Sequence, residues 1–177
     1  MTRRVALLRG VNVNGIAIKS ADLKALFAEE LGFGAVRTVL ASGNVLFDTD
    51  ERDATALRKR IEQALRKRFG YEAWIVLLTQ KQVADVAKAY PFERIDDERH
   101  PYIVFGSDTA MLDEIVEKAG TVDADVEQLE PGKGVLYWQC PRGESLDTPV
   151  AKLLAKTRYK SSTTTRNLRT VEKLLTG

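Results

Sequence analysis

Apolar residues along the first half of the chain switch between the spacing of a strand and that of a helix. Leu57, Ile61 and Leu65 recur at the interval that places side chains on one helical face, whereas the stretch 3–8 ends in four consecutive apolar residues, as buried strands do. The predicted elements are, in order, a strand at 3–8, a helix from Ser20, strands at 35–40 and 44–47, a helix from Asp50, a strand at 72–78 and a helix from Thr79. This order is the ferredoxin-like one.

The second half nearly repeats this order after a polar stretch bounded by prolines, 91–101, which we interpret as a linker. The prediction is therefore an α+β fold of two ferredoxin-like halves in tandem, residues 1–90 and 102–177, with a C-terminal helix in the second. The predicted elements of the second half are a strand at 102–106, a helix at 108–119, a hairpin of 123–129 with 134–140, a helix from Thr148 and a last helix at 166–175.

Composition narrows the class of protein. Apolar residues make up 44% and charged residues 29% of the 177 residues, as in folded globular chains. No apolar run approaches the roughly 18 residues that span a bilayer, and the N-terminal apolar stretch is too short for a signal peptide. We therefore predict a cytoplasmic protein without a membrane partner. The single cysteine, Cys140, excludes an internal disulfide, and its apolar surroundings predict a buried, unreactive thiol.

Positive charge is concentrated toward the two ends of the chain. The net charge is +2, but residues 1–19 carry +4 and residues 152–177 carry +6, which leaves −8 for the residues between them. If folding brings the two ends together, they form one basic surface on an otherwise acidic body. The alternative is that each basic end is solvated independently.

Three polar stretches carry the candidate chemistry. They are rich in Arg, Asn, Ser and Thr and contain no carboxylate or imidazole, so they can donate hydrogen bonds to an anion but make poor general bases. The third stretch opens the predicted last helix, whose N-terminus would add backbone N–H donors and a partial positive charge. The candidate ligand-binding residues are Arg9, Asn12, Asn14, Lys19, Ser42, Asn44, Thr165, Arg166 and Asn167.

The leading hypothesis is binding of a small ligand that bears a phosphate or a carboxylate. Arg9 and Arg166 would pair with the anion, while Asn12, Ser42 and Asn44 would orient it. One alternative is a nucleic-acid-binding module that uses the basic ends; the expected first strand has no aromatic residue on which a base could stack, so this alternative depends on phosphate contacts. The other alternative is structural, because buried Arg and Asn side chains often hold turns through backbone carbonyls.

Other kinds of site are not indicated. One histidine, His100, and one cysteine are too few for a zinc site, and the sequence contains neither a P-loop nor a dinucleotide fingerprint. We predict no metal and no cofactor, and His100, in the charged linker, is expected to be solvated. No base and nucleophile stand out as a pair, so the sequence leaves open whether the protein is an enzyme.

Taken together, "LLRGVNVNG" with the following Lys19, "LASGNVLF" and "TTTRNLRTVEKLL" resemble the hallmark segments of the bacterial domain-of-unknown-function 1697 family, and the resemblance spans nearly the whole chain. The sequence departs from the family pattern at Asn14 and Ile16, where more glycine and lysine are usual, and at Leu168, where tryptophan is common. The resemblance implies no activity. It implies that the signature positions are Arg9, Asn12, Ser42, Gly43, Asn44, Arg166 and Asn167.

Overall fold

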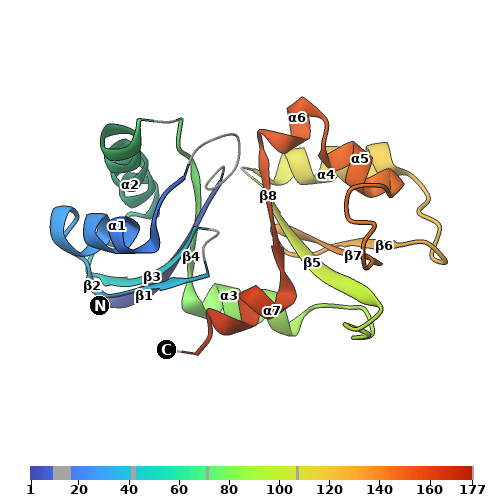
Figure 1. Cartoon of the computed structure of the whole chain (residues 1–177), viewed down its shortest axis with the longest axis horizontal. Helices are drawn as coiled ribbons and strands as arrows, with labels where there is room; N and C mark the ends of the chain where they lie inside the picture. The colour runs from blue at the N-terminus through green and yellow to red at the C-terminus, as the bar shows by residue number, and fades with distance from the viewer. Residues whose placement is uncertain (10–16, 41–42, 71, 107, 177) are drawn as a thin grey trace. The chain divides into compact units, whose positions relative to one another are not determined.

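Figure 1 shows the computed structural model, which describes residues 1–9, 17–40, 43–70, 72–106 and 108–176. The chain is a mixed α/β protein with two four-stranded antiparallel sheets. It divides into two compact units, Met1–Ala84 with Lys173–Gly177, and Asp85–Glu172. The stretch 91–101, which the sequence suggested as a linker, lies within the second unit. Among the described residues, no helix combines the length and apolar character needed to cross a bilayer.

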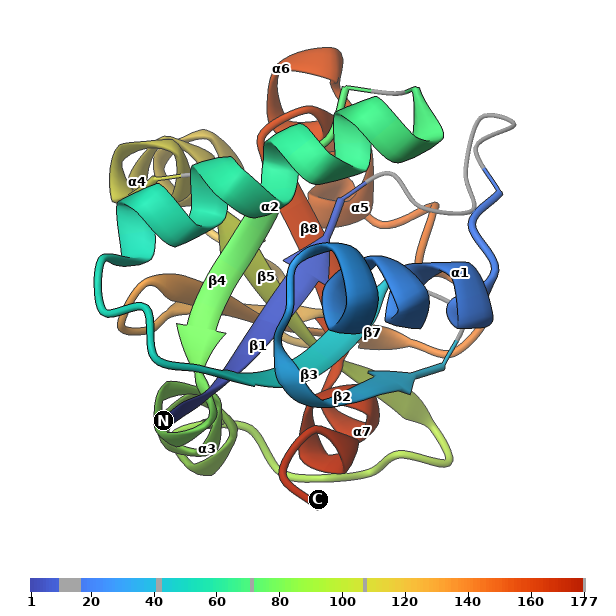
Figure 2. The ribbon, with the colours of Figure 1, turned by 90° about the vertical axis from the view of Figure 1, so that its left-hand side faces the viewer.

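The first unit contains a sheet with the strand order β2-β3-β1-β4. Figure 2 shows the helices α1 and α2 lying across one face of that sheet. All the strands and helices predicted for this half are present, because their apolar periodicity is unambiguous. The elements are β1 (Thr2–Leu8), α1 (Ser20–Ala25), the π-helix η1 (Leu26–Glu30), β2 (Gly34–Val39), β3 (Asn44–Thr49), α2 (Ala54–Phe69), β4 (Ile75–Thr79) and the start of α3 (Gln80–Lys88).

Alternating side chains of the central strands build the core of the first unit. Ala6 and Leu8 of β1 and Phe47 of β3 are buried beneath the apolar face of α2, to which Leu57 and Ile61 contribute. The Phe47 ring is stacked on Phe33 at 4.6 Å between centroids and meets Phe27 edge-on at 5.4 Å. Such aromatic pairs add specific geometry to the area that they bury.

Local hydrogen bonds fix where the helices begin and end. The N-cap of α2 is Asp53, and not Asp50 as predicted, because the Asp53 carboxylate accepts two backbone N–H groups at 3.0 and 3.1 Å. Gly70 ends α2 in the left-handed conformation that favours glycine. The predicted capping box of α3 is confirmed: the Thr79 N–H donates to Gln82 Oε1 at 2.8 Å, and the Gln82 N–H donates to Thr79 Oγ1 at 3.1 Å.

The second unit has the strand order β6-β7-β5-β8, and in Figure 1 the helices α4, α5 and α6 lie on one side of this sheet. Its core includes Val104, Leu112, Ile115 and Trp138. The elements are β5 (Arg99–Gly106), α4 (Thr109–Ala119), β6 (Gln128–Pro131), β7 (Val135–Pro141), α5 (Pro149–Leu154), α6 (Thr157–Lys160), β8 (Thr163–Asn167) and α7 (Leu168–Lys173).

Three predictions for the second half are wrong. The strand predicted at 123–129 begins only at Gln128, as β6, because residues 124–126 form a turn in which the Asp123 carbonyl accepts the N–H groups of Val126 and Glu127. Residues 163–167 form the strand β8, antiparallel to β5, and the last helix α7 begins only at Leu168. Three consecutive threonines favour a strand because their branched side chains fit a pleated surface. His100 is half-buried and is not solvated in a linker, because β5 already begins at Arg99; its ring centroid lies 5.4 Å from that of Tyr102.

The predicted burial of the single thiol is confirmed. Cys140 is buried in the core of the second unit, and burial raises the pKa of its thiol to about 12. Because the thiolate is the reactive species, we expect a thiol reagent to leave the native protein unmodified at pH 8 and to label one thiol per chain in denaturant. Rapid labelling of the native chain would contradict this assignment.

The same burial predicts a pH dependence of stability. Above the pKa of an unfolded cysteine, about 8.5, the unfolded chain loses a proton that the folded chain keeps, so the free energy of unfolding should fall as the pH rises. Urea unfolding at pH 7 and pH 10 measures this change. In Cys140→Ala the decrease should be smaller than in the unaltered chain, because the remaining part comes from other groups.

Candidate functional site

The end of β1 brings the first two sequence-predicted stretches together within the first unit. The backbone N–H of Leu8 donates to the Gly43 carbonyl at 2.8 Å, and that of Arg9 donates to the Trp74 carbonyl at 3.2 Å. The half-buried Arg9 therefore follows a strand whose end lies beside the turn that precedes β3. The turn is thus contacted by the backbone of Leu8, whereas the backbone N–H of Arg9 itself bonds to Trp74, just before β4.

Asn44 holds this turn in place. Its side chain is buried, and its Nδ2 donates to the Val39 carbonyl at 2.9 Å, across the turn that joins β2 to β3. The turn includes Leu40 and Gly43, both at positive φ, 57° and 77°. An amide that closes a turn through a backbone carbonyl is the pattern of a structural residue. For Asn44, the geometry thus favours the structural alternative over contact with a ligand.

The substitution Asn44→Ala tests whether Asn44 has this structural role. Removing the amide leaves the Val39 carbonyl without that donor in a buried place, so we expect the free energy of unfolding to fall by about 1–3 kcal/mol. Chemical denaturation measures the change. Asn167→Ala is the matched comparison, since it removes the cap of α7 from a half-buried position and should cost about 1 kcal/mol. An Asn44→Ala protein as stable as the parent would show that the side chain is retained for another reason.

The other residues of the first unit give less support to a binding site. Lys19 is exposed and takes the N-cap position of α1, where Ser20 was predicted, but its side chain makes no capping hydrogen bond. Asn12, Asn14 and Ser42 lie outside the described residues.

Thr165, Arg166 and Asn167 lie on β8, in the second unit. Arg166 is buried; its Nη1 donates to Thr164 Oγ1 and, at 3.2 Å, to the Thr165 carbonyl. Burial lowers the pKa of its guanidinium to about 10. The Asn167 Oδ1 accepts the N–H of Arg169 at 2.9 Å and so caps α7. The predicted helix beginning at Arg166 is therefore wrong, because Arg166 is part of the strand β8 and supplies no helix N-terminus.

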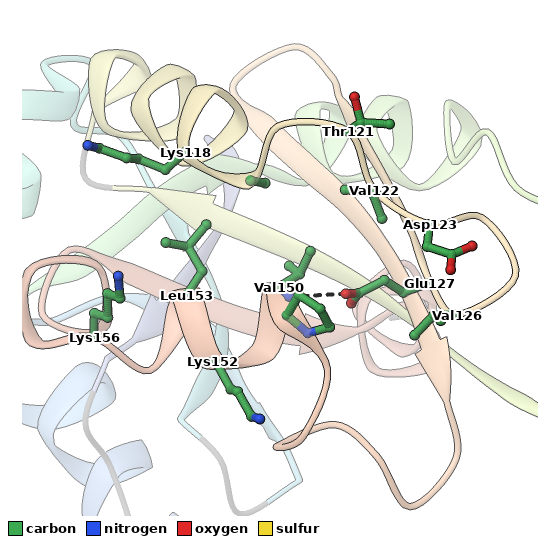
Figure 3. A pocket seen from close by; sticks show the side chains of 12 residues that line it. Lys118, Thr121, Val122, Asp123, Val126, Glu127, Val150, Lys152, Leu153 and Lys156 are labelled. Atoms are coloured by element: carbon green, nitrogen blue, oxygen red, sulfur yellow. Dashed lines mark hydrogen bonds between the residues drawn. The ribbon is translucent and has the colours of Figure 1, made fainter.

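A cleft of about 490 Å³ opens in the second unit between the end of α4, the segment 121–127 and α5. Three exposed lysines line it: Lys118 from α4, Lys152 from α5, and Lys156 just beyond α5. Val150 and Leu153 give it an apolar floor. In Figure 3, Lys118 and Lys156 lie on one side of the cleft, and Asp123 and Glu127 lie on the other. We call this site the lysine cleft.

Glu127 holds the helix that forms the floor of the lysine cleft to the sheet. Its side chain is only 1% exposed, and its two carboxylate oxygens accept different donors. Oε1 accepts the Trp138 Nε1–H at 2.8 Å, and Oε2 accepts the Val150 backbone N–H at 3.0 Å, the bond drawn in Figure 3. The carboxylate thereby ties the first turn of α5 to the sheet strand β7. This arrangement fixes the floor of the cleft relative to its sides.

The lysine cleft suits binding better than acid–base chemistry. Its exposed ammonium groups attract anions, and its apolar floor accepts a hydrophobic portion of the same ligand. The buried carboxylate of Glu127 is already occupied by two donors. Within the part of the chain that the structure describes, no group of three or more His, Cys, Asp or Glu side chains is placed to hold a metal ion.

Comparisons with known proteins place the chain in a family. The family model described as "Protein of unknown function (DUF1697)" matches residues 1–137. The chain belongs to the DUF1697 family. Its fold is similar to that of the conserved bacterial protein SP0830 from Streptococcus pneumoniae, with a TM-score of 0.77, 22% sequence identity, and coverage of 98% of this chain and 96% of that one. No curated protein matches the sequence.

The DUF1697 match covers the signature stretches of the first unit, whereas residues 163–175 lie beyond the matched range. The lysine cleft of this DUF1697 protein was not found by sequence reasoning. Lys152 and Lys156 belong to the basic terminal segment whose charge was noted, but Lys118 comes from a separate helix. A usable signal was Thr148-Pro149, which predicted the start of α5 and which the structure confirms as a capped helix N-terminus.

Proposed function

We propose that this DUF1697 protein binds a small ligand with a phosphate or carboxylate group in the lysine cleft. The observation that carries the proposal is the group of three exposed lysines that line a cleft with an apolar floor, Lys118 and Lys156 on one side and Lys152 extending away from them (Figure 3). The volume, about 490 Å³, lies within the range of about 300–1,000 Å³ that is typical of small-molecule sites. Lysine is a common phosphate-binding residue because its ammonium acts as a compact point charge.

The position of the lysines on separate elements supports a ligand that spans the cleft. Lys118 ends α4, whereas Lys152 and Lys156 belong to α5 and the residues that follow it. With Val150 and Leu153 between them, the ligand would place its anion toward the lysines and its apolar portion over the floor. Glu127 would act as a positioning residue, because it holds α5 without offering a free oxygen pair to the cleft.

Melting-temperature measurements with inorganic phosphate and with hexanoate test the proposal. A probe that binds only the folded state stabilises it, by about 2.7 kcal/mol at 100 times its Kd. We expect at least one probe to raise the melting temperature, and the triple variant K118A/K152A/K156A to lose that response. The control K24A/K59A/K67A removes the same charge from exposed positions of the first unit and should respond like the parent.

Three results would overturn this proposal. The first is that neither probe stabilises the parent. The second is that the triple variant responds to the probes as the parent does. The third is that the response disappears in Arg9→Ala and persists in the triple variant. The last result would place the anion at the end of β1, where the sequence analysis proposed its donors.

The second candidate function is nucleic-acid binding through the basic terminal segment. It is favoured by the exposure of six of the seven basic residues from 152 onward. Anisotropy of a labelled single-stranded oligonucleotide, measured over a salt series, separates the two candidates, because phosphate contacts weaken steeply as salt rises. Absence of a complex at low salt removes this candidate. The exposed residues are Lys152, Lys156, Arg158, Lys160, Arg169 and Lys173.

We infer that each unit has a ferredoxin-like fold. This inference is supported by the order strand, helix, strand, strand, helix, strand within each unit, and by the equivalent sheet orders β2-β3-β1-β4 and β6-β7-β5-β8. An experimental structure in which either sheet has a different strand order would overturn it.

A further inference from the structure

A second cleft, of about 380 Å³, lies in the same unit as the lysine cleft but uses different residues of α5. Ala151 and Leu154 line it, whereas the lysine cleft is lined by Val150 and Leu153. Its other walls come from β5, β7, the segment 145–146, α6 and β8. We call it the aromatic cleft, for the rings described next.

Two stacked aromatic rings form one wall of the aromatic cleft. Tyr102 of β5 and Trp138 of β7 are directly opposite each other in the sheet, with ring centroids 5.1 Å apart and planes inclined by 28°. Trp138 is 4% exposed, and its Nε1–H is held by the buried Glu127 carboxylate. Tyr102 is half-buried and therefore offers more ring surface to the cleft. Because the rings are stacked on each other, the face of Tyr102 turned away from Trp138 is the surface on which a further ring could stack, and Glu127 holds Trp138 in place.

Polar groups stand at the side of this wall. Lys160 of α6 supplies a cation, while Ser145 and Thr165 supply hydroxyl groups. Thr165 is one of the residues that the sequence analysis selected as ligand-binding. Leu146, also in the lining, is 82% exposed and adds an apolar surface next to the rings.

We propose that the aromatic cleft binds a planar aromatic ring that carries an anionic group. The ring stacks on Tyr102, which in turn is stacked on Trp138, and contacts Leu154, while the anion lies toward Lys160. A nucleoside monophosphate and an aromatic carboxylate share this chemistry. The aromatic cleft shares no lining residue with the lysine cleft, so this proposal and the proposed function can be tested independently.

Fluorescence of Trp138 gives a direct test. The chain has two tryptophans, so Trp74→Phe leaves Trp138 as the sole reporter. In this background we would titrate AMP, 4-hydroxybenzoate, adenosine and ribose 5-phosphate. We expect a saturable change with AMP, 4-hydroxybenzoate or both, and weak or no binding of ribose 5-phosphate. AMP alone would indicate a nucleotide as the natural class, and 4-hydroxybenzoate alone an aromatic carboxylate.

Variants connect the response to the site. Base–aromatic stacking is worth about 1–3 kcal/mol, so Tyr102→Leu should raise the Kd about 5- to 150-fold, with Tyr90→Leu as a matched control outside the cleft. Lys160→Ala should weaken the charged probes and leave adenosine unchanged, with Lys133→Ala as its control. Ala155→Phe fills the cleft from an exposed position and should abolish binding even if Tyr102→Leu does not fold.

The lysine-cleft variant K118A/K152A/K156A should keep the Trp138 response, which separates this inference from the proposed function. The inference is overturned if neither AMP nor 4-hydroxybenzoate gives a saturable change. It is also overturned if ribose 5-phosphate binds as tightly as AMP, or if Ala155→Phe binds as the parent does.

Discussion

Replacing Glu127 with alanine should lower the free energy of unfolding by about 3–5 kcal/mol, the cost expected when one partner of a buried, charge-assisted network is removed. Two donors depend on this carboxylate: the Trp138 indole N–H and the Val150 backbone N–H. Neither can reach bulk water easily, because Trp138, Val150 and Glu127 are all buried. The loss should loosen α5 from β7, and urea unfolding followed by tryptophan fluorescence measures it.

Glu127→Gln sharpens this prediction. The glutamine oxygen can still accept one of the two N–H groups, but its amide N–H₂ then faces the other donor, so we expect a smaller loss of about 1–3 kcal/mol. Glu130→Ala is the control: Glu130 is exposed on β6, and its removal should change stability by less than about 0.5 kcal/mol. Equal stability of Glu127→Ala and Glu130→Ala would refute the anchoring role.

Phe47→Ala should destabilise the first unit by about 3–5 kcal/mol. The Phe47 ring is fully buried and touches both Phe33 and Phe27, so its deletion leaves a cavity that rigid strands cannot close. Chemical denaturation measures the loss. Because the protein has two compact units, circular dichroism and the fluorescence of Trp74, in the first unit, should be recorded together.

Two comparisons test whether the cavity causes the loss of stability in Phe47→Ala. Phe47→Leu keeps most of the apolar volume and should lose less than half as much stability as Phe47→Ala. Phe92→Ala removes a half-buried ring that meets Tyr90 edge-on, so its effect should also be smaller. A Phe47→Ala protein no less stable than Phe92→Ala would contradict the role assigned to the cluster.

The first half of the fold was predictable because its signals are local. Leu57, Ile61 and Leu65 have helical spacing, and Thr79 with Gln82 forms a capping box that depends on a few neighbouring residues. The start of α2 was misplaced by three residues, at Asp50 in place of Asp53, because several acidic side chains compete for the cap and only the backbone geometry decides between them.

The strand β8 was missed for the opposite reason. A stretch such as 163–167 has the composition of a helix cap as well as that of a strand, and what decides is the antiparallel pairing with β5, far away in the sequence. The consequence for function is direct. Arg166 was assigned to a helix N-terminus, whereas its guanidinium is buried against Thr164 and the backbone of β8.

The candidate clefts depend on the same kind of non-local information. Lys118 meets Lys152 and Lys156 only because α4 and α5 pack side by side in the second unit, and Tyr102 meets Trp138 only through the register of β5 with β7. Residue type alone was enough to select Arg9 and Asn44 as candidate binding residues. It did not distinguish a residue that contacts a ligand from an amide that closes a turn, as Asn44 does.

Glu127 is an anchor that the two clefts share. One oxygen holds the indole that backs the aromatic cleft, and the other holds the helix that floors the lysine cleft. A substitution at Glu127 therefore acts on both clefts at once. Glu127→Gln should accordingly change the binding of probes in both clefts, whereas a substitution that lines one cleft alone should change binding in that cleft only.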